Sequence, residues 1–363
     1  MRYSSEFRDP GVARCLLDEI AATVQGADQT MTLMEVCGTH TMAIYQHGIR
    51  ALLPPAIRLV SGPGCPVCVT PIGYVDHAVA LARRPNTILA TFGDMLRVPG
   101  SSSSLLREKA QGADIRIVYS PLDAVALAAK HPQQTVVFLG VGFETTAPTV
   151  AGSIVTAQSR GLHNYFVLTA HKTMPAPMAA LTADPELQVD GYLCPAHVSA
   201  VIGATPYEEL AAKHGVPCVI TGFEPLDMLQ GILLLARQVV AGEARVEIQY
   251  SRVVRPEGNK KALALLAEVF TPCAADWRGI GVIPGSGLAL RSDWRAFDAA
   301  MQLPVNVEPA QEHPGCRCGE ILKGQIGPRD CPLFRTVCTP EEPVGACMVS
   351  SEGTCAAEYK YGS

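Results

Sequence analysis

Cysteine is the residue whose spacing in this chain most directly suggests chemistry. Six of the thirteen cysteines fall within the last 48 residues of a 363-residue sequence: Cys316, Cys318, Cys331, Cys338, Cys347 and Cys355. Iron–sulfur clusters need four thiolates that converge from flexible loops, and this crowded group favours such a cluster. Zinc also accepts four thiolates, although the paired C-x2-C spacing of a zinc ribbon is missing. Buried core thiols are the alternative for one or two of the six.

A second group of cysteines lies near the N-terminus, in glycine- and proline-rich strings that predict exposed, reactive thiols. Cys65 and Cys68 form a C-x-x-C pair within GPGCPVCVTP. In such a pair, proximity lowers the pKa of one thiol and permits a reversible disulfide. The two Cα atoms should then lie roughly 4.4–6.8 Å apart. Because half of a zinc site has the same spacing, a metal-ligand role is the alternative.

Cys37 and His40 stand three residues apart in the string CGTHT, directly after a predicted strand. A thiol and an imidazole at this spacing could be a nucleophile with its base, or two ligands of one metal. The alternative is a cysteine that packs at the strand end and a histidine that hydrogen-bonds locally. Glu35, inside the strand, is interpreted as structural.

The composition argues against several classes of protein. No run of about 18 apolar residues occurs, so we expect no membrane span. The first nine residues carry both charges and no apolar core, which predicts no secretory signal. We therefore expect a cytoplasmic protein, in which cysteines are more often metal ligands or redox groups than structural disulfides. A net charge of −5 and an aromatic content of 6% argue against nucleic-acid binding.

Short apolar runs rich in β-branched residues predict the strands that must position these groups. They cover residues 31–36, 57–60, 87–91, 115–119, 135–139, 165–169 and 216–221. Helical patterns lie between them, at residues 75–82, 121–129, 147–159 and 226–241. This alternation predicts an α/β fold with mainly parallel sheets. The CGTHT, SGPGCP and FGD strings follow strands directly, where parallel sheets place ligands.

We divide the sequence into four parts. Residues 1–23 are an N-terminal extension, and residues 24–130 form an α/β lobe with the CGTHT and CPVC loops. Residues 131–240 form a second α/β lobe. Residues 241–363 contain a linker helix and a smaller, loop-rich iron–sulfur region that its cofactor helps to hold together.

Eight long and unusual strings are spread over nearly the whole chain. They are CGTHT (37–41), SGPGCPVCVTP (61–71), TFGDMLRVPGS (91–101), GFETTAP (142–148), CPAHVS (194–199), TGFEPLDML (221–229), GCRCGEIL (315–322) and CMVSSEGTCAA (347–357). Together they resemble the HypD family of hydrogenase maturation proteins.

The resemblance implies a specific function. Members of this family act as a scaffold with redox activity, on which the Fe(CN)2CO group of [NiFe]-hydrogenase is assembled. The implied partners are a small HypC-type chaperone and a HypE-type cyanide donor that is supplied by HypF. The hydrogenase large subunit would be served indirectly. Enzymatic turnover in the strict sense is not implied.

The resemblance also implies a cysteine-lined cleft between two α/β lobes and a [4Fe-4S] cluster in the C-terminal region. By motif, Cys37 would be the thiolate that binds the Fe(CN)2CO iron, and Cys65 and Cys68 would be the redox pair. His40 and Asp94 would be the polar helpers of the cleft.

Four of the six C-terminal cysteines are predicted to ligate the cluster: Cys318, Cys331, Cys338 and Cys355. Cys318 is preferred to Cys316 because Gly319 beside it allows close backbone approach. Cys347 is set aside because it opens an apolar segment. Functions of other classes stay open, namely an iron–sulfur disulfide reductase that acts on a protein substrate through Cys65 and Cys68, and a metal-stabilised binding module without a redox role.

Overall fold

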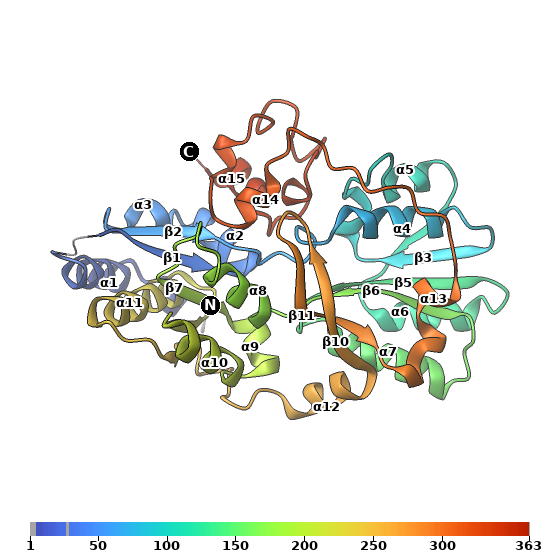
Figure 1. The fold of residues 1–363 in the computed structure, drawn as a ribbon, viewed down its shortest axis with the longest axis horizontal. Helices are drawn as coiled ribbons and strands as arrows, with labels where there is room; N and C mark the ends of the chain where they lie inside the picture. The colour runs from blue at the N-terminus through green and yellow to red at the C-terminus, as the bar shows by residue number, and fades with distance from the viewer. Residues whose placement is uncertain (1–4, 27–28, 363) are drawn as a thin grey trace.

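Two parallel β-sheets form the framework of the protein (Figure 1). The computed structural model describes residues 5–26 and 29–362. The first sheet, on the left in Figure 1, contains in spatial order β2 (Ile57–Ser61), β1 (Met31–Glu35), β7 (Gly191–Pro195), β8 (Cys218–Thr221) and β9 (Val246–Ile248). The second sheet, on the right, contains β4 (Asp114–Ile117), β3 (Thr87–Thr91), β5 (Thr135–Gly142) and β6 (Tyr165–His171). The predicted α/β class with mainly parallel sheets is confirmed.

Helices pack against both sheets. Those that precede or alternate with strands of the first sheet are α1 (Pro10–Thr23), α2 (Gly38–Gln46), α3 (Ile49–Leu52), α9 (Ala196–Ile202), α10 (Thr205–His214) and α11 (Pro225–Ala241). Those that connect the sheets or alternate with strands of the second are α4 (Ile72–Ala82), α5 (Leu105–Ala110), α6 (Pro121–Lys130), α7 (Ala147–Ser159) and α8 (Pro175–Thr182). Short 3-10 helices are η1 (Ser5–Arg8) and η2 (Gly93–Arg97).

The longest helix, α11, shows how local sequence sets the boundaries of an element. Pro225 occupies its first turn, where the missing N–H costs nothing. Glu224 and Asp227 form a capping box that satisfies N–H groups at the same end. Gly242 ends the helix in the left-handed conformation with φ 64°, which glycine adopts without steric cost.

The two sheets do not follow the predicted division at residue 130. Residues 87–171 build the second sheet, and the chain then returns to the first sheet, where Leu33 of β1 pairs with Gly191 of β7. The first lobe is therefore made from two separate parts of the sequence. The prediction missed β7 because this five-residue strand begins with glycine and ends with proline, both of which are rare in strands.

The C-terminal part of the chain is loop-rich, as predicted, and it also contains a hairpin that the sequence did not predict. An antiparallel hairpin, β10 (Phe270–Trp277) and β11 (Gly281–Leu290), runs between the two lobes in Figure 1 and follows α12 (Lys260–Val269). Short helices come next: η3 (Ser292–Phe297), α13 (Ala299–Gln302), α14 (Cys318–Leu322), η4 (Pro328–Asp330), η5 (Ala346–Met348) and α15 (Thr354–Tyr361). We call residues 315–361 the cysteine region. In Figure 1 this region lies at the top of the view, over the junction of the two lobes.

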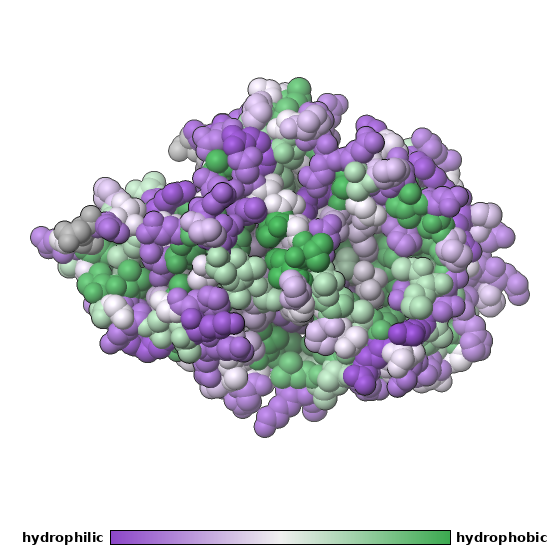
Figure 2. Space-filling model, viewed as in Figure 1, coloured by the Kyte–Doolittle hydropathy of each residue, from purple (hydrophilic) through white to green (hydrophobic). Residues whose placement is uncertain are grey.

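One continuous apolar core joins these parts. It contains Leu139 of the second sheet, Cys194 of the first, Trp277 of the hairpin and Cys318 of the cysteine region. Figure 2 shows mainly hydrophilic residues on the outer parts of one face and apolar residues gathered near its centre. Within residues 5–26 and 29–362, no helix is both long and apolar enough to cross a bilayer.

Candidate functional site

Cys37 lies just beyond the carboxyl end of β1, an interior strand of the first sheet. The neighbours of β1 are β2 on one side and β7 on the other, so the strand order reverses at this strand. Ligands of parallel sheets bind at such switch points. Asp94 occupies the equivalent position in the second sheet, in η2 directly after β3, which lies between β4 and β5. The prediction that these residues follow strand ends is confirmed.

The thiol of Cys37 sits at the N-terminus of α2. Burial raises the pKa of this thiol to about 12, while hydrogen bonds from the backbone N–H groups of His40 and Thr39 act in the opposite direction. The thiol is therefore protonated in the free chain. A bound cation would take the place of that proton, since metal binding requires the thiolate.

The loop that carries Cys65 packs directly on Cys37. The N–H of Gly38 donates to the carbonyl oxygen of Gly64 at 2.9 Å. A Cβ atom at Gly64 would lie 2.2 Å from the backbone nitrogen of Cys37, so only glycine fits at this contact. The backbone contact therefore holds Cys37 beside the C-x-x-C turn.

Cys65 and Cys68 are joined by a disulfide, and their Cα atoms are 5.2 Å apart. This separation lies inside the predicted window. The expectation of exposed thiols is wrong, because the exposed fractions are 8% for Cys37, 3% for Cys65 and 0% for Cys68. Gly62 and Gly64 of the loop pack closely on Met34 and Cys37, and composition alone could not distinguish such packing from exposure.

Glu35 supports Cys37 from inside the first sheet. One carboxylate oxygen accepts from the N–H of Cys37 at 3.1 Å, and the other accepts from the hydroxyl of Thr41 at 2.5 Å. Burial raises the pKa of Glu35 to about 7. The interpretation of Glu35 as structural missed its contact with the backbone of the candidate iron ligand.

His40 lies on the far side of the same helical turn. Its Nε2 is 2.9 Å from the carbonyl oxygen of Thr221, and its ring packs at 5.0 Å on Phe223. Burial lowers the pKa of His40 to about 4, so the ring is neutral and Nε2 carries the proton that the carbonyl accepts. The other nitrogen, Nδ1, is buried without a hydrogen-bond partner and is available as an acceptor.

Asp94 is linked to this site through a residue that the sequence analysis missed. Glu352 of the cysteine region accepts a hydrogen bond from the hydroxyl of Thr39 at 2.8 Å. Burial, together with the charge of Asp94, raises the pKa of Glu352. A Cβ atom at Gly38 would lie 2.4 Å from the Cβ of Glu352, so the cysteine region rests on the start of α2.

All six C-terminal cysteines line a single cavity in the cysteine region. Its other walls are mostly apolar and include Ile321, Leu333, Phe334 and Met348. The donor set fits an iron–sulfur cluster, which needs four converging thiolates in a largely apolar shell. The six cysteines are Cys316, Cys318, Cys331, Cys338, Cys347 and Cys355.

The thiols are closer together here than around a cluster. The Sγ atoms of Cys318 and Cys347 are 2.7 Å apart. Hydrogen bonds from Cys316 and Cys347 lower the pKa of Cys318. In the described part of the chain, no group of three or more His, Cys, Asp or Glu side chains has a geometry that could hold a metal ion. The geometry does not select four ligands, and Cys347 lies inside the cavity rather than apart from it.

The tip of the β10–β11 hairpin connects the C-x-x-C turn to this cavity. The side-chain Nε of Arg278 donates to the carbonyl oxygen of Thr70 at 2.8 Å, and its backbone N–H donates to that of Val69 at 3.0 Å. On the other side, a Cβ atom at Gly279 would lie 2.2 Å from the Cα of Gly319. Backbone contacts therefore run from just after Cys68 to the neighbour of Cys318.

Comparisons with known proteins match the whole chain. A family model named HypD, described as the hydrogenase formation hypA family, matches residues 11–362. The hydrogenase expression/formation protein HupD of Azotobacter chroococcum is 50% identical, with 100% of this chain and 97% of the relative covered. The hydrogenase maturation factors HypD of Rhodobacter capsulatus and Escherichia coli K12 are 47% and 43% identical, with 98% of each relative covered. These alignments cover 100% and 99% of this chain.

Proposed function

The chain belongs to the HypD family of hydrogenase maturation factors, and from this premise we propose that it is a redox-active scaffold for assembly of the Fe(CN)2CO group. The iron group is the cargo of the scaffold. A small HypC-type partner would share the iron, a HypE-type protein would deliver cyanide, and the hydrogenase large subunit would receive the product. The chemistry is reductive and suits the cytoplasm, where thiols are kept reduced.

The observation that carries this proposal is the contact between Cys37 and the C-x-x-C turn. It brings the candidate iron thiolate beside the disulfide-bonded pair Cys65 and Cys68, for which we propose a redox role, at a switch point of the sheet. Soft thiolates suit low-spin iron that carries cyanide and CO. A buried Cys37 with a raised pKa binds such an iron by releasing its proton. A second thiolate from the HypC-type partner would complete the protein ligands.

Cys65 and Cys68 would supply and store the electrons at the assembly site. Reduction of their disulfide consumes two electrons and two protons and gives two thiols, and reoxidation returns them. A [4Fe-4S] cluster in the six-cysteine cavity would supply one-electron reduction. Four residues are proposed to hold it: Cys318, Cys331, Cys338 and Cys355. The contacts of Arg278 and Gly279 provide a short connection between the two centres.

Polar groups on two sides of Cys37 would accept and donate protons or hydrogen bonds. The buried His40 is neutral, and its free Nδ1 can accept a proton or a hydrogen bond. Asp94 is exposed, and its charge helps to raise the pKa of Glu352. Glu352 accepts a hydrogen bond from the hydroxyl of Thr39. Of these groups, the exposed Asp94 can exchange protons with solvent while cyanide and CO bind to the iron.

Anaerobic infrared spectroscopy tests the proposal. The protein is co-purified with its HypC-type partner from cells that contain the cyanide donor, and the stretching bands of bound CO and cyanide are recorded. If the protein is the proposed scaffold, the co-purified complex contains iron and shows both sets of bands. A disulfide reductase would show thiol–disulfide cycling without these bands, and a binding module would show neither.

A further inference from the structure

Arg278, at the tip of the β10–β11 hairpin, is a buried cation between the C-x-x-C turn and the six-cysteine cavity. Its side chain is only 4% exposed. Its backbone N–H donates to the carbonyl oxygen of Val69 at 3.0 Å, and its Nε donates to that of Thr70 at 2.8 Å. Both acceptors are neutral, so they satisfy donors without balancing the charge. The interior of the protein therefore holds a positive charge close to the end of this turn.

The carboxylate that faces Arg278 balances this charge only in part. The Nε of Arg278 and an Oε1 of Glu312 are 3.7 Å apart, which is too far for a hydrogen bond. The side chain of Glu312 is 44% exposed, so water solvates much of it. The Nη2 of Arg278 is buried, and among the described residues it has no hydrogen-bond partner. A buried cation with a spare donor costs free energy unless a negative group lies nearby.

The six-cysteine cavity lies on the other side of Arg278. A Cβ atom at Gly279 would lie 2.2 Å from the Cα of Gly319, so the hairpin tip touches the residue next to Cys318. Hydrogen bonds from two neighbouring thiols are the main cause that lowers the pKa of Cys318, and the charge of Arg278 acts in the same direction. The positive charge of Arg278 thus acts at the wall of the cavity.

We propose that Arg278 is the counter-charge of a [4Fe-4S] cluster in this cavity and that it raises the reduction potential of the cluster. The inference rests on the proposed function, because it requires the cluster. A cluster bound by four thiolates is an anion, and reduction adds one electron to it. A fixed positive charge in the protein interior stabilises the reduced form more than the oxidised form. The charge around a cluster is one of the properties that set its potential.

The position of Arg278 gives this charge a role in electron transfer. A reductant outside the chain would supply electrons to the cluster one at a time. Two of these electrons, with two protons, would convert the disulfide of Cys65 and Cys68 into two thiols. A higher cluster potential lets weaker donors begin this sequence. Arg278 would therefore help to decide which reductants can serve the assembly site.

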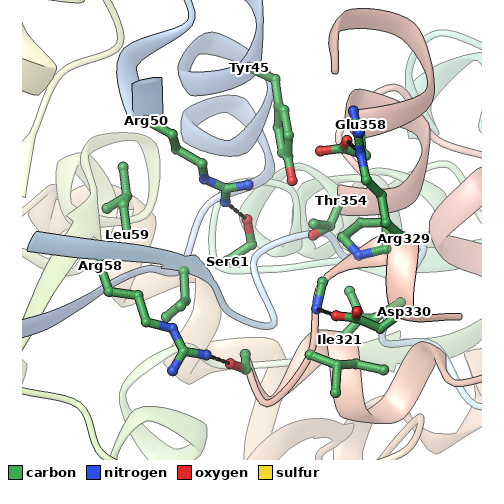
Figure 3. A pocket seen from close by; sticks show the side chains of 15 residues that line it. Tyr45, Arg50, Arg58, Leu59, Ser61, Ile321, Arg329, Asp330, Thr354 and Glu358 are labelled. Atoms are coloured by element: carbon green, nitrogen blue, oxygen red, sulfur yellow. Dashed lines mark hydrogen bonds and ion pairs between the residues drawn. The ribbon is translucent and has the colours of Figure 1, made fainter. Parts of the chain in front are cut away.

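Arg58 is a matched arginine at the surface. It donates to the carbonyl oxygen of Gly324 in the cysteine region at 3.3 Å, as Arg278 donates to a carbonyl oxygen of the turn (Figure 3). Arg58 is exposed, however, and it lines a pocket of about 350 Å³ between β2 and the cysteine region. Water and salt screen such a charge. Its removal is therefore the control for removal of the buried charge.

Anaerobic redox titration of the full chain with a reconstituted cluster tests the proposal, with the reduced cluster followed by electron paramagnetic resonance. In Arg278→Gln, the ratio of reduced to oxidised cluster at a fixed potential should fall on the order of tenfold, which is a shift of the midpoint by about 59 mV to lower potential. Arg278→Lys keeps the charge and should retain most of the potential. Arg58→Gln should have the midpoint of the unchanged protein.

An unchanged midpoint in Arg278→Gln, or an equal shift in Arg278→Gln and Arg278→Lys, would overturn the proposal. If Arg278→Gln fails to fold, Glu312→Gln decides, because the side chain of Glu312 is exposed. Loss of this opposing carboxylate should raise the midpoint, and the absence of a rise would overturn the proposal. A cluster whose potential ignores Arg278 would leave the proposed scaffold function standing, whereas the absence of any cluster would overturn the cluster assignment and this inference together.

Discussion

Gly64 packs on the backbone of Cys37 so closely that no side chain fits between them. This contact joins the loop after β2 to the loop after β1, and it sets Cys37 beside the bond between Cys65 and Cys68. An iron bound by Cys37 would therefore lie next to a two-electron store. The proposed function depends on this arrangement more than on any single side chain.

The Cys65–Cys68 pair should cycle between dithiol and disulfide. Because both thiols are buried, they should be trapped by alkylation in denaturant after anaerobic oxidation or reduction. Mass spectrometry should find two fewer alkylated cysteines in the oxidised sample, and the difference should map to these two residues. Equal labelling in both states would leave only a metal-ligand role for the pair.

The hairpin tip should matter for electron transfer to that pair. Gly279→Ala places a methyl group 2.2 Å from the Cα of Gly319, so the tip must move away from the cysteine cavity. The disulfide should then be reduced more slowly in protein that carries a reconstituted cluster. The measurement is the rate of dithiol formation after addition of dithionite, followed by alkylation.

Gly281→Ala is the matched control for that experiment. Gly281 also has a positive φ, 99° against 70° for Gly279, but a Cβ atom there meets nothing within 4 Å. Both variants thus place an alanine at a positive φ, and only Gly279→Ala disturbs the contact with Gly319. Identical rates in the two variants would argue against a route through the hairpin tip.

The cavity of six cysteines should hold the iron–sulfur cluster. Cys331→Ala should abolish the visible absorption of the cluster and most of the iron, and it should destabilise the cysteine region. Cys273→Ala removes a half-buried thiol of β10 outside this cavity and should change neither. Cluster absorption and iron content that persist in Cys331→Ala would remove this residue from the ligand set.

The buried Glu144 should make stability depend on pH. Burial raises its pKa to about 7 in the folded protein, while one oxygen accepts from the N–H of Met174 and the other has no partner. The protonated form is favoured by folding. Its stabilising effect is therefore complete below the pKa of the unfolded chain, near 4.3, and is lost as the pH rises through about 7.

Glu144→Gln keeps the shape of the side chain and removes this titration. Relative to the unchanged protein, the variant should gain about 3 kcal/mol of stability between pH 4 and pH 8, because a pKa shift of one unit corresponds to roughly 1.4 kcal/mol. Urea unfolding at both pH values measures the difference. Glu209→Gln, at an exposed position of α10, should show no such gain. A constant difference between Glu144→Gln and the unchanged protein would contradict this account.

The sequence predicted the elements that carry the site better than it predicted how they pair. Apolar β-branched runs located β1, β2, β3 and β5 closely, because strands buried on both faces leave a continuous hydrophobic signal. The return of the chain through β7 was missed, since strand pairing depends on contacts between residues far apart in sequence. The hairpin was missed because Pro272 and the glycines of β11 weaken the strand pattern.

The site was predictable where chemistry has a local sequence pattern. The C-x-x-C pair and the cysteine at a strand end could be recognised from spacing. The role of Glu352 could not, because an acidic residue in a loop carries no pattern until folding places it against Thr39. Burial of the thiols was also missed, since residues far along the chain pack on their loops, Glu352 on Gly38 and Arg278 on Thr70.

Infrared spectroscopy of the Cys37→Ala variant, co-purified anaerobically with the HypC-type partner, tests the central claim most directly. Loss of the thiol should remove the CO and cyanide bands from the complex, while the visible spectrum of the cluster and the bond between Cys65 and Cys68 remain. Cys273→Ala, prepared in the same way, should keep the bands. Bands that persist in Cys37→Ala would show that the iron is held elsewhere and would contradict the account.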